Sequence, residues 1–172
     1  CSRLDVQAMI ASNTSRARQT AEIIREKTGV DFETSALFAE RRRPTSLMGR
    51  FTTESDARQM EDAWRKGSLG DGPRIEDGEH FEDIKDRTVN ALKFLENHPA
   101  ETILVITHGF FLRALVAGVV LGDKFKSPEF KEIMFGFVTN NTGMSVFNLA
   151  PNEDSGTTRW FVRIWNDHAH LG

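Results

Sequence analysis

The chain has 172 residues and a mass of 19.4 kDa, the length of one domain with a single hydrophobic core. Hydrophobic residues make up 39% and charged residues 27%, which excludes the disordered, collagen-like and disulfide-rich classes. With 22 basic and 25 acidic residues the net charge is −3, so the chain as a whole lacks the excess of positive charge that is typical of nucleic-acid-binding proteins.

The first third of the chain predicts a strand, a helix and a second strand. Residues 6–12 form an apolar run that ends in small polar residues, as a buried strand does before a helix. The helix that follows places four residues on one face: Ala17, Thr20, Ala21 and Ile24. Gly29 is expected at its C-terminus, and Arg16 therefore lies in its first turn. Residues 30–34 alternate apolar and polar side chains and predict a second short strand.

The middle of the chain predicts two helices, a loop and a third strand. A helix is expected over residues 55–66, an exposed loop over 67–78 and an amphipathic helix over 81–95. We expect Glu79 to be a carboxylate at the N-terminus of that second helix, where it stabilises the helix dipole. Residues 102–107 are a β-branched apolar run, typical of a strand covered on both faces in a parallel sheet.

The C-terminal third predicts two helices and a hairpin. Residues 110–121 form an apolar helix ended by Gly122, and Ser127 is expected to be the N-cap of the next helix. The strand-like segments 144–149 and 157–165, joined by a turn-rich stretch, indicate an antiparallel hairpin. The order of elements predicts an α/β fold: a mostly parallel central sheet with helices on both faces, followed by a C-terminal antiparallel hairpin.

Cysteine content and apolar run length bear on location. The single cysteine, Cys1, excludes an internal disulfide and a multi-cysteine metal site, and it fits a reducing compartment. The longest apolar run, residues 110–121, is interrupted by Arg113 and is shorter than the roughly 20 residues that span a bilayer. We therefore expect a cytoplasmic protein that binds neither membranes nor nucleic acids.

Polar residues follow two of the predicted strands, at the sheet edge where α/β proteins bind ligands. Arg16 begins a helix after the first strand, and His108 precedes a helix after the strand over 102–107. The N-terminus of a helix favours an anion, and the planar guanidinium of arginine matches phosphate oxygens. The sequence thus predicts a phosphate site at this edge.

Four segments carry recognisable motifs. Residues 12–21 read S-N-T-S-R-A-R-Q-T-A, and residues 106–115 read I-T-H-G-F-F-L-R-A-L. The first resembles the S-x-x-x-R-A-x-Q-T-A segment of the histidine phosphatase superfamily, the phosphoglycerate-mutase-like proteins, and the second resembles that family's second histidine motif. Glu40, followed by an arginine, falls where the family places its acid, and residues 77–80 (D-G-E-H) resemble its G-E-S segment. The resemblance extends from about Val6 to the C-terminal hairpin.

The resemblance implies a single histidine-phosphatase-like domain over residues 1–172 and a histidine that attacks phosphorus to form a phosphohistidine. In the family this nucleophile belongs to an N-terminal R-H-G motif. That motif does not occur in this sequence, in which the five histidines are His80, His98, His108, His168 and His170. The resemblance therefore implies that the nucleophile, together with the family's first strand and helix, lies upstream of Cys1.

The same resemblance implies roles for residues in this chain. Arg16 and His108 are expected to hold the phosphoryl oxygens, and Glu40 to protonate the leaving group as a general acid. The residues expected to bind substrate beside them are Arg41, Gly109 and Phe110. Burial would raise the pKa of Glu40, whereas the arginines at 41–43 would lower it, and those arginines could equally form a solvated basic loop. No metal or cofactor is expected, and the partner is a small phosphorylated substrate.

Three functions remain open at this point. The first is a metal-independent phosphoric monoester hydrolase that acts through a phosphohistidine. The second is a cofactor-dependent phosphoglycerate mutase, although the stretch between Glu40 and His108 is shorter than in true mutases and favours a phosphatase. The third is a non-catalytic phosphate-binding domain, because the chain contains no R-H-G. Homo-oligomer formation is left open.

Overall fold

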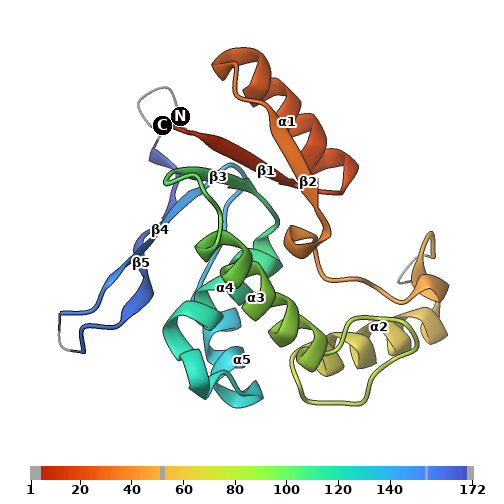
Figure 1. The fold of residues 1–172 in the computed structure, drawn as a ribbon. Helices are drawn as coiled ribbons and strands as arrows, with labels where there is room; N and C mark the ends of the chain where they lie inside the picture. The colour runs from red at the N-terminus through yellow and green to blue at the C-terminus, as the bar shows by residue number, and fades with distance from the viewer. Residues whose placement is uncertain (1–4, 51–52, 154, 170–172) are drawn as a thin grey trace.

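A three-stranded parallel sheet lies at the centre of the computed structural model, which describes residues 5–50, 53–153 and 155–169. Its strands are β1 (Ala8–Ser12), β2 (Phe32–Ser35) and β3 (Ile103–Ile106), in the order β2-β1-β3. A separate antiparallel pair is formed by β4 (Met144–Pro151) and β5 (Thr158–Asp167). The predicted α/β class, the parallel sheet and the C-terminal hairpin are confirmed (Figure 1).

Helices cover both faces of the sheet. They are α1 (Ser15–Thr28), α2 (Ser55–Ser68), α3 (Phe81–Glu96), α4 (Gly109–Leu121) and α5 (Ser127–Gly136). Short 3-10 turns occur at η1 (Ala36–Phe38), η2 (Thr45–Leu47) and η3 (Gly122–Lys124). In Figure 1, α1 lies on one side of the sheet and α3 with α4 on the other, while α2 stands apart beside the start of α3.

Alternation along β1 assigns its side chains to two apolar clusters, because successive strand residues point to opposite faces. Met9 and Ala11 pack with Ala21 of α1. Ile10 joins the larger core on the other face, which includes Phe111 of α4 and Ile84 of α3. One strand thereby anchors both layers of helices.

β1, rather than β3, is the strand that is fully covered. Residues from Met9 to Ser12 are buried, whereas all four residues of β3 are half-buried. In the described part of the chain β3 pairs with β1 alone and forms an edge of the sheet, so its apolar composition does not give it the burial expected of an interior strand.

Several predicted boundaries shift by a residue or two. Gly29 ends α1 in the left-handed conformation with φ of 74°, as expected. α2 continues to Ser68, inside the predicted loop, because that residue is buried rather than exposed. Lys126, not Ser127, is the N-cap of α5, and the Ser127 hydroxyl instead donates to the Leu69 carbonyl at 2.8 Å.

The apolar helix α4 remains short. Its 13 residues rise about 20 Å at 1.5 Å per residue, less than the thickness of a bilayer core. None of the described helices is long and apolar enough to cross a membrane.

Candidate functional site

The parallel pairing of β1 with β3 brings the predicted site residues to one edge of the sheet. Ala11 lies opposite Ile106, so the residues that follow the two strands emerge side by side. Thr14 is the N-cap of α1, and His108 is the N-cap of α4. The N-termini of two helices therefore meet at this edge, as predicted.

His108 is held at both ring nitrogens. Its Nδ1 accepts hydrogen bonds from Nε of Arg16 at 3.1 Å and from Nη2 at 2.8 Å. Its Nε2 lies 2.8 Å from Oγ of Ser12 and 3.2 Å from Oγ1 of Thr14. A guanidinium can only donate, so Nδ1 is unprotonated and the proton is on Nε2, from which it is donated to the serine hydroxyl. The imidazole is neutral in this arrangement.

The surroundings of His108 favour that neutral form. Burial, which leaves the residue 8% exposed, lowers the pKa of His108 below its ordinary value of 6.5, and the positive charge of Arg16 lowers it further. Arg87 acts in the same direction, and the carboxylate of Glu40 opposes it. An anion bound beside Arg16 would favour the imidazolium form and raise the pKa of His108.

Glu40 lies in the loop after η1 and is half-buried. Its Oε1 accepts a hydrogen bond from the backbone N–H of Arg41 at 2.9 Å. The Glu40 carboxylate is near enough to His108 and Arg113 to raise the pKa of each, against the larger lowering that burial causes in both. The predicted acid thus acts electrostatically on His108.

Arg41 is enclosed rather than solvated. Its guanidinium lies between the rings of Trp64 of α2 and Phe110 of α4, at 4.5 and 4.2 Å from their centres. Nη1 donates to Oγ of Ser68 at 2.7 Å, and burial lowers the pKa of Arg41 to about 10. The guanidinium of Arg41 is thus held by contacts with both α2 and α4.

The next two arginines tie the loop to other elements. Arg42 donates from Nε to the Asp77 carbonyl at 2.9 Å, and Arg43 pairs with Glu61 of α2 at 2.7 Å. These contacts engage both guanidinium groups with residues outside the loop.

The first turn of α4 contains the other two predicted substrate-binding residues. Phe110 is 7% exposed and packs against Phe130, so its side chain belongs to the core. Gly109 is half-buried, and a Cβ placed there would lie 2.7 Å from Oγ1 of Thr139. What both residues can offer a ligand is the first-turn backbone N–H, which has no partner within the helix.

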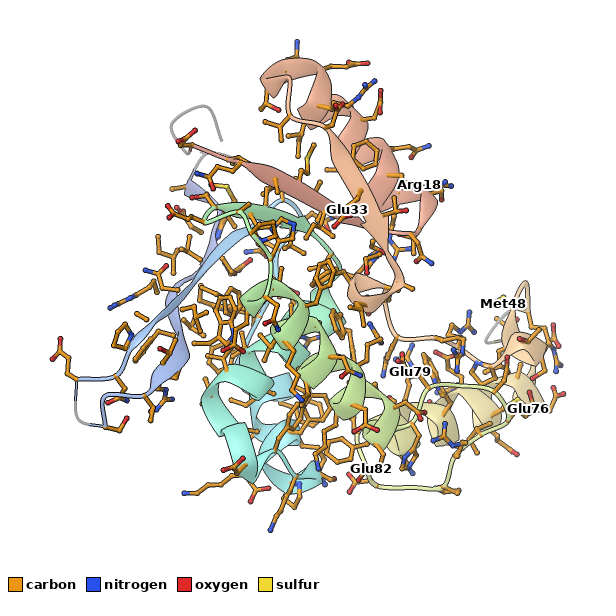
Figure 2. The ribbon with its side chains drawn as sticks, in the orientation of Figure 1. Arg18, Glu33, Met48, Glu76, Glu79 and Glu82 are labelled. Atoms are coloured by element: carbon orange, nitrogen blue, oxygen red, sulfur yellow. The ribbon has the colours of Figure 1, made fainter. Side chains whose placement is uncertain are left out.

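Glu79 lies at the N-terminal end of α3, as predicted, because it immediately precedes the N-cap His80. Its carboxylate is also a buried partner of Arg87, with an N–O distance of 2.7 Å. Figure 2 shows it inside the junction between α3 and the loop before η2, whereas Glu76 and Glu82 lie at the outside. Glu79 precedes the N-cap of α3 and Arg87 lies two turns into that helix, so no helical spacing in the sequence marked the two residues as partners.

The described residues contain no cluster of three or more histidine, cysteine or acidic side chains that could hold a metal ion. The groups that converge at the sheet edge are a guanidinium, an imidazole, two hydroxyls and a carboxylate. This set suits an anion that is held by donors and reacts beside an acid.

Comparison with known proteins agrees with this geometry. The family model of the histidine phosphatase superfamily (branch 1) matches residues 1–157. The chain belongs to this superfamily. A probable phosphoglycerate mutase, GpmB of Escherichia coli O1:K1, is 30% identical over 122 residues, covering 68% of this chain and 54% of GpmB. The chain thus spans about half the length of the curated relatives it matches.

Two solved structures illustrate the same fold. YhfR of Bacillus stearothermophilus superposes with a TM-score of 0.75 at 21% identity, covering 99% of this chain and 78% of YhfR. A mycobacterial glucosyl-3-phosphoglycerate phosphatase, in complex with inorganic phosphate, has a TM-score of 0.69 at 18% identity, covering 98% and 80%. The predicted phosphoglycerate-mutase-like fold is confirmed.

Proposed function

We propose that this domain is the phosphate-binding and acid-donating part of a phosphoric monoester hydrolase that acts through a phosphohistidine. The observation that carries the proposal is the Arg16–His108 contact, which joins two motifs 92 residues apart at the N-termini of two helices. Membership of the histidine phosphatase superfamily supports it.

The donors at this edge suit the equatorial oxygens of a phosphoryl group. Arg16 would turn its Nε and Nη2 donors from the imidazole to the phosphate, and His108 would donate from Nδ1 after taking up a proton. Fixed positive groups of this kind stabilise the charge of the transferring phosphoryl, which is the main requirement of the reaction.

Glu40 supplies the proton that the leaving oxygen needs. The electrostatic effect of its carboxylate on His108 and Arg113 supports this role. The nucleophilic histidine is expected upstream of Cys1, and water would then hydrolyse the phosphohistidine. A small phosphate monoester is the proposed substrate.

The test uses the full-length natural protein. Arg16→Ala and His108→Ala are expected to abolish release of inorganic phosphate from para-nitrophenyl phosphate, with losses of about 10²-fold or more. Arg18→Ala is the matched control, because it removes the same charge from the exposed side of α1 and should leave turnover unchanged (Figure 2). Retained activity in both site variants would refute the proposal.

A phosphoglycerate mutase is the second candidate, because the curated relative named above is a probable mutase. A mutase returns the phosphoryl group to a substrate hydroxyl, whereas a hydrolase gives it to water. Interconversion of the two phosphoglycerate isomers that outpaces phosphate release would favour the mutase. Binding of a phosphate ester with neither turnover nor phosphohistidine would instead indicate a non-catalytic phosphate-binding domain.

A further inference from the structure

The three residues before Glu40 are held by their backbone carbonyls. Nη1 of Arg87, on α3, donates to the carbonyl of Leu37 at 3.0 Å and to that of Ala39 at 2.7 Å. The carbonyl between them, that of Phe38, accepts from the hydroxyl of Thr107 at 2.7 Å. Because Thr107 immediately precedes His108, these bonds relate the Glu40 loop directly to the phosphate site.

The residue that follows Glu40 and Arg41 is held as well. The carboxylate of Glu79 accepts from the backbone N–H of Arg42 at 3.0 Å, and the N–H of Glu79 donates to the Arg42 carbonyl at 2.9 Å. The loop is therefore bound on both sides of the proposed acid.

A single buried ion pair connects the two sides. Arg87 donates to both carboxylate oxygens of Glu79, from Nε at 2.7 Å and from Nη2 at 2.8 Å. The two side chains are 15% and 8% exposed, and the guanidinium stacks over the ring of Phe111 at 4.0 Å. A buried ion pair adds little net stability compared with apolar residues of the same volume. The role of this pair is therefore better inferred from the backbone groups that it binds.

We propose that Glu79 and Arg87 are a positioning pair, which sets the Glu40 carboxyl at the leaving-group side of the phosphate site. The inference rests on the proposed function. Arg41 extends the chain of contacts, since its backbone N–H binds the Glu40 carboxylate and its guanidinium is fixed between two rings. The pair acts through the loop backbone and touches neither the phosphoryl group nor the leaving group.

A positioning role and a general structural role predict different effects on substrates with different leaving groups. An alkoxide needs a proton as it departs, whereas para-nitrophenolate leaves without one, so a displaced general acid slows only the first kind of substrate. The experiment compares kcat/KM for glycerol phosphate and for para-nitrophenyl phosphate in the full-length natural protein.

Two variants test the pair. Arg87→Lys keeps the charge beside Glu79, but the three N–H groups of lysine cannot make the four hydrogen bonds that Arg87 makes to the carboxylate and the two carbonyls. Glu79→Gln keeps the shape of the carboxylate and removes its charge, and it serves if the first variant does not fold. Each is expected to lower kcat/KM for glycerol phosphate by about 10- to 100-fold and for para-nitrophenyl phosphate by less than about 3-fold.

Glu61→Gln is the matched control. Glu61 is also a buried carboxylate, 7% exposed, paired with Arg43 and Arg65, but it makes no contact with the backbone of residues 37–42 among the bonds described here. Replacing Glu61 should change kcat/KM for both substrates by the same factor. Equal losses on both substrates in the Arg87 and Glu79 variants would overturn the inference while leaving the proposed function intact. A wild-type protein that hydrolyses neither substrate would overturn both.

Discussion

The neutral state of His108 depends on one guanidinium and on burial. Burial and the charge of Arg16 lower the pKa of His108 below 6.5. Arg16 also donates hydrogen bonds to Nδ1, the nitrogen that must take up a proton for the imidazolium to form. We expect Arg16→Ala to raise the pKa of His108 in an NMR titration of the imidazole, and Arg18→Ala to leave it unchanged. An unchanged or lower pKa in the Arg16 variant would contradict the hydrogen-bond assignment.

The same shift links stability to pH. Because the folded pKa of His108 lies below the unfolded value of 6.5, the unfolded chain binds more protons in the acid range. His108 therefore destabilises the fold as pH falls through about 6.5 toward its folded pKa, and the penalty is absent above that window. His108→Gln should flatten this part of the pH profile of the urea-unfolding free energy. A profile of unchanged slope would show that His108 does not carry the effect.

At the scale of elements, a glycine governs how the loop of residues 40–44 packs on α2 and α3. A Cβ at Gly78 would lie 2.8 Å from ring atoms of Pro44 and 2.8 Å from Cδ1 of Trp64, and neither ring can move without displacing its neighbours. Gly78→Ala is expected to lower the free energy of unfolding by about 1–3 kcal/mol, measured in urea.

Gly72, which lies with Gly78 in the loop between α2 and α3, provides the comparison. A Cβ there would meet its nearest neighbours at 3.4 to 3.8 Å, which is ordinary contact. Gly72→Ala should change stability by about 0.5 kcal/mol or less. If both alanine variants lost the same stability, the crowding at Gly78 would not be the cause.

At the scale of the whole molecule, we expect protection of backbone amides from hydrogen exchange to differ between the central sheet and the hairpin. β1 is the middle strand, with both neighbours paired and helices packed on each face. The residues of the β4–β5 hairpin are half-buried or exposed, and outside their own pairing they pack chiefly against α4. Native-state hydrogen exchange should be slowest in β1 and α4 and faster in the hairpin. Equal protection of hairpin and sheet would indicate a single cooperative unit.

Local patterns in the sequence were sufficient for the elements and for part of the site. Apolar periodicity and capping residues predicted the α-helices and strands of the described residues to within a few residues, because these signals arise from neighbours along the chain, whereas the 3-10 turns η1, η2 and η3 were not predicted. Arg16 and His108 could be placed together without coordinates, since each follows a parallel strand and such strands end at one edge of a sheet.

Only the tertiary structure decided how the loop around Glu40 is held. The bonds that Glu79 and Arg87 make to it span 37 and 48 residues, and nothing in their local sequence distinguishes a buried ion pair from solvated charges. The enclosure of Arg41 between Trp64 and Phe110 is of the same kind, because aromatic residues on helical faces predict burial but not what they cover. Helices and strands depend on residues that are neighbours in the sequence, whereas the environment of a charged side chain depends on residues that only folding brings together.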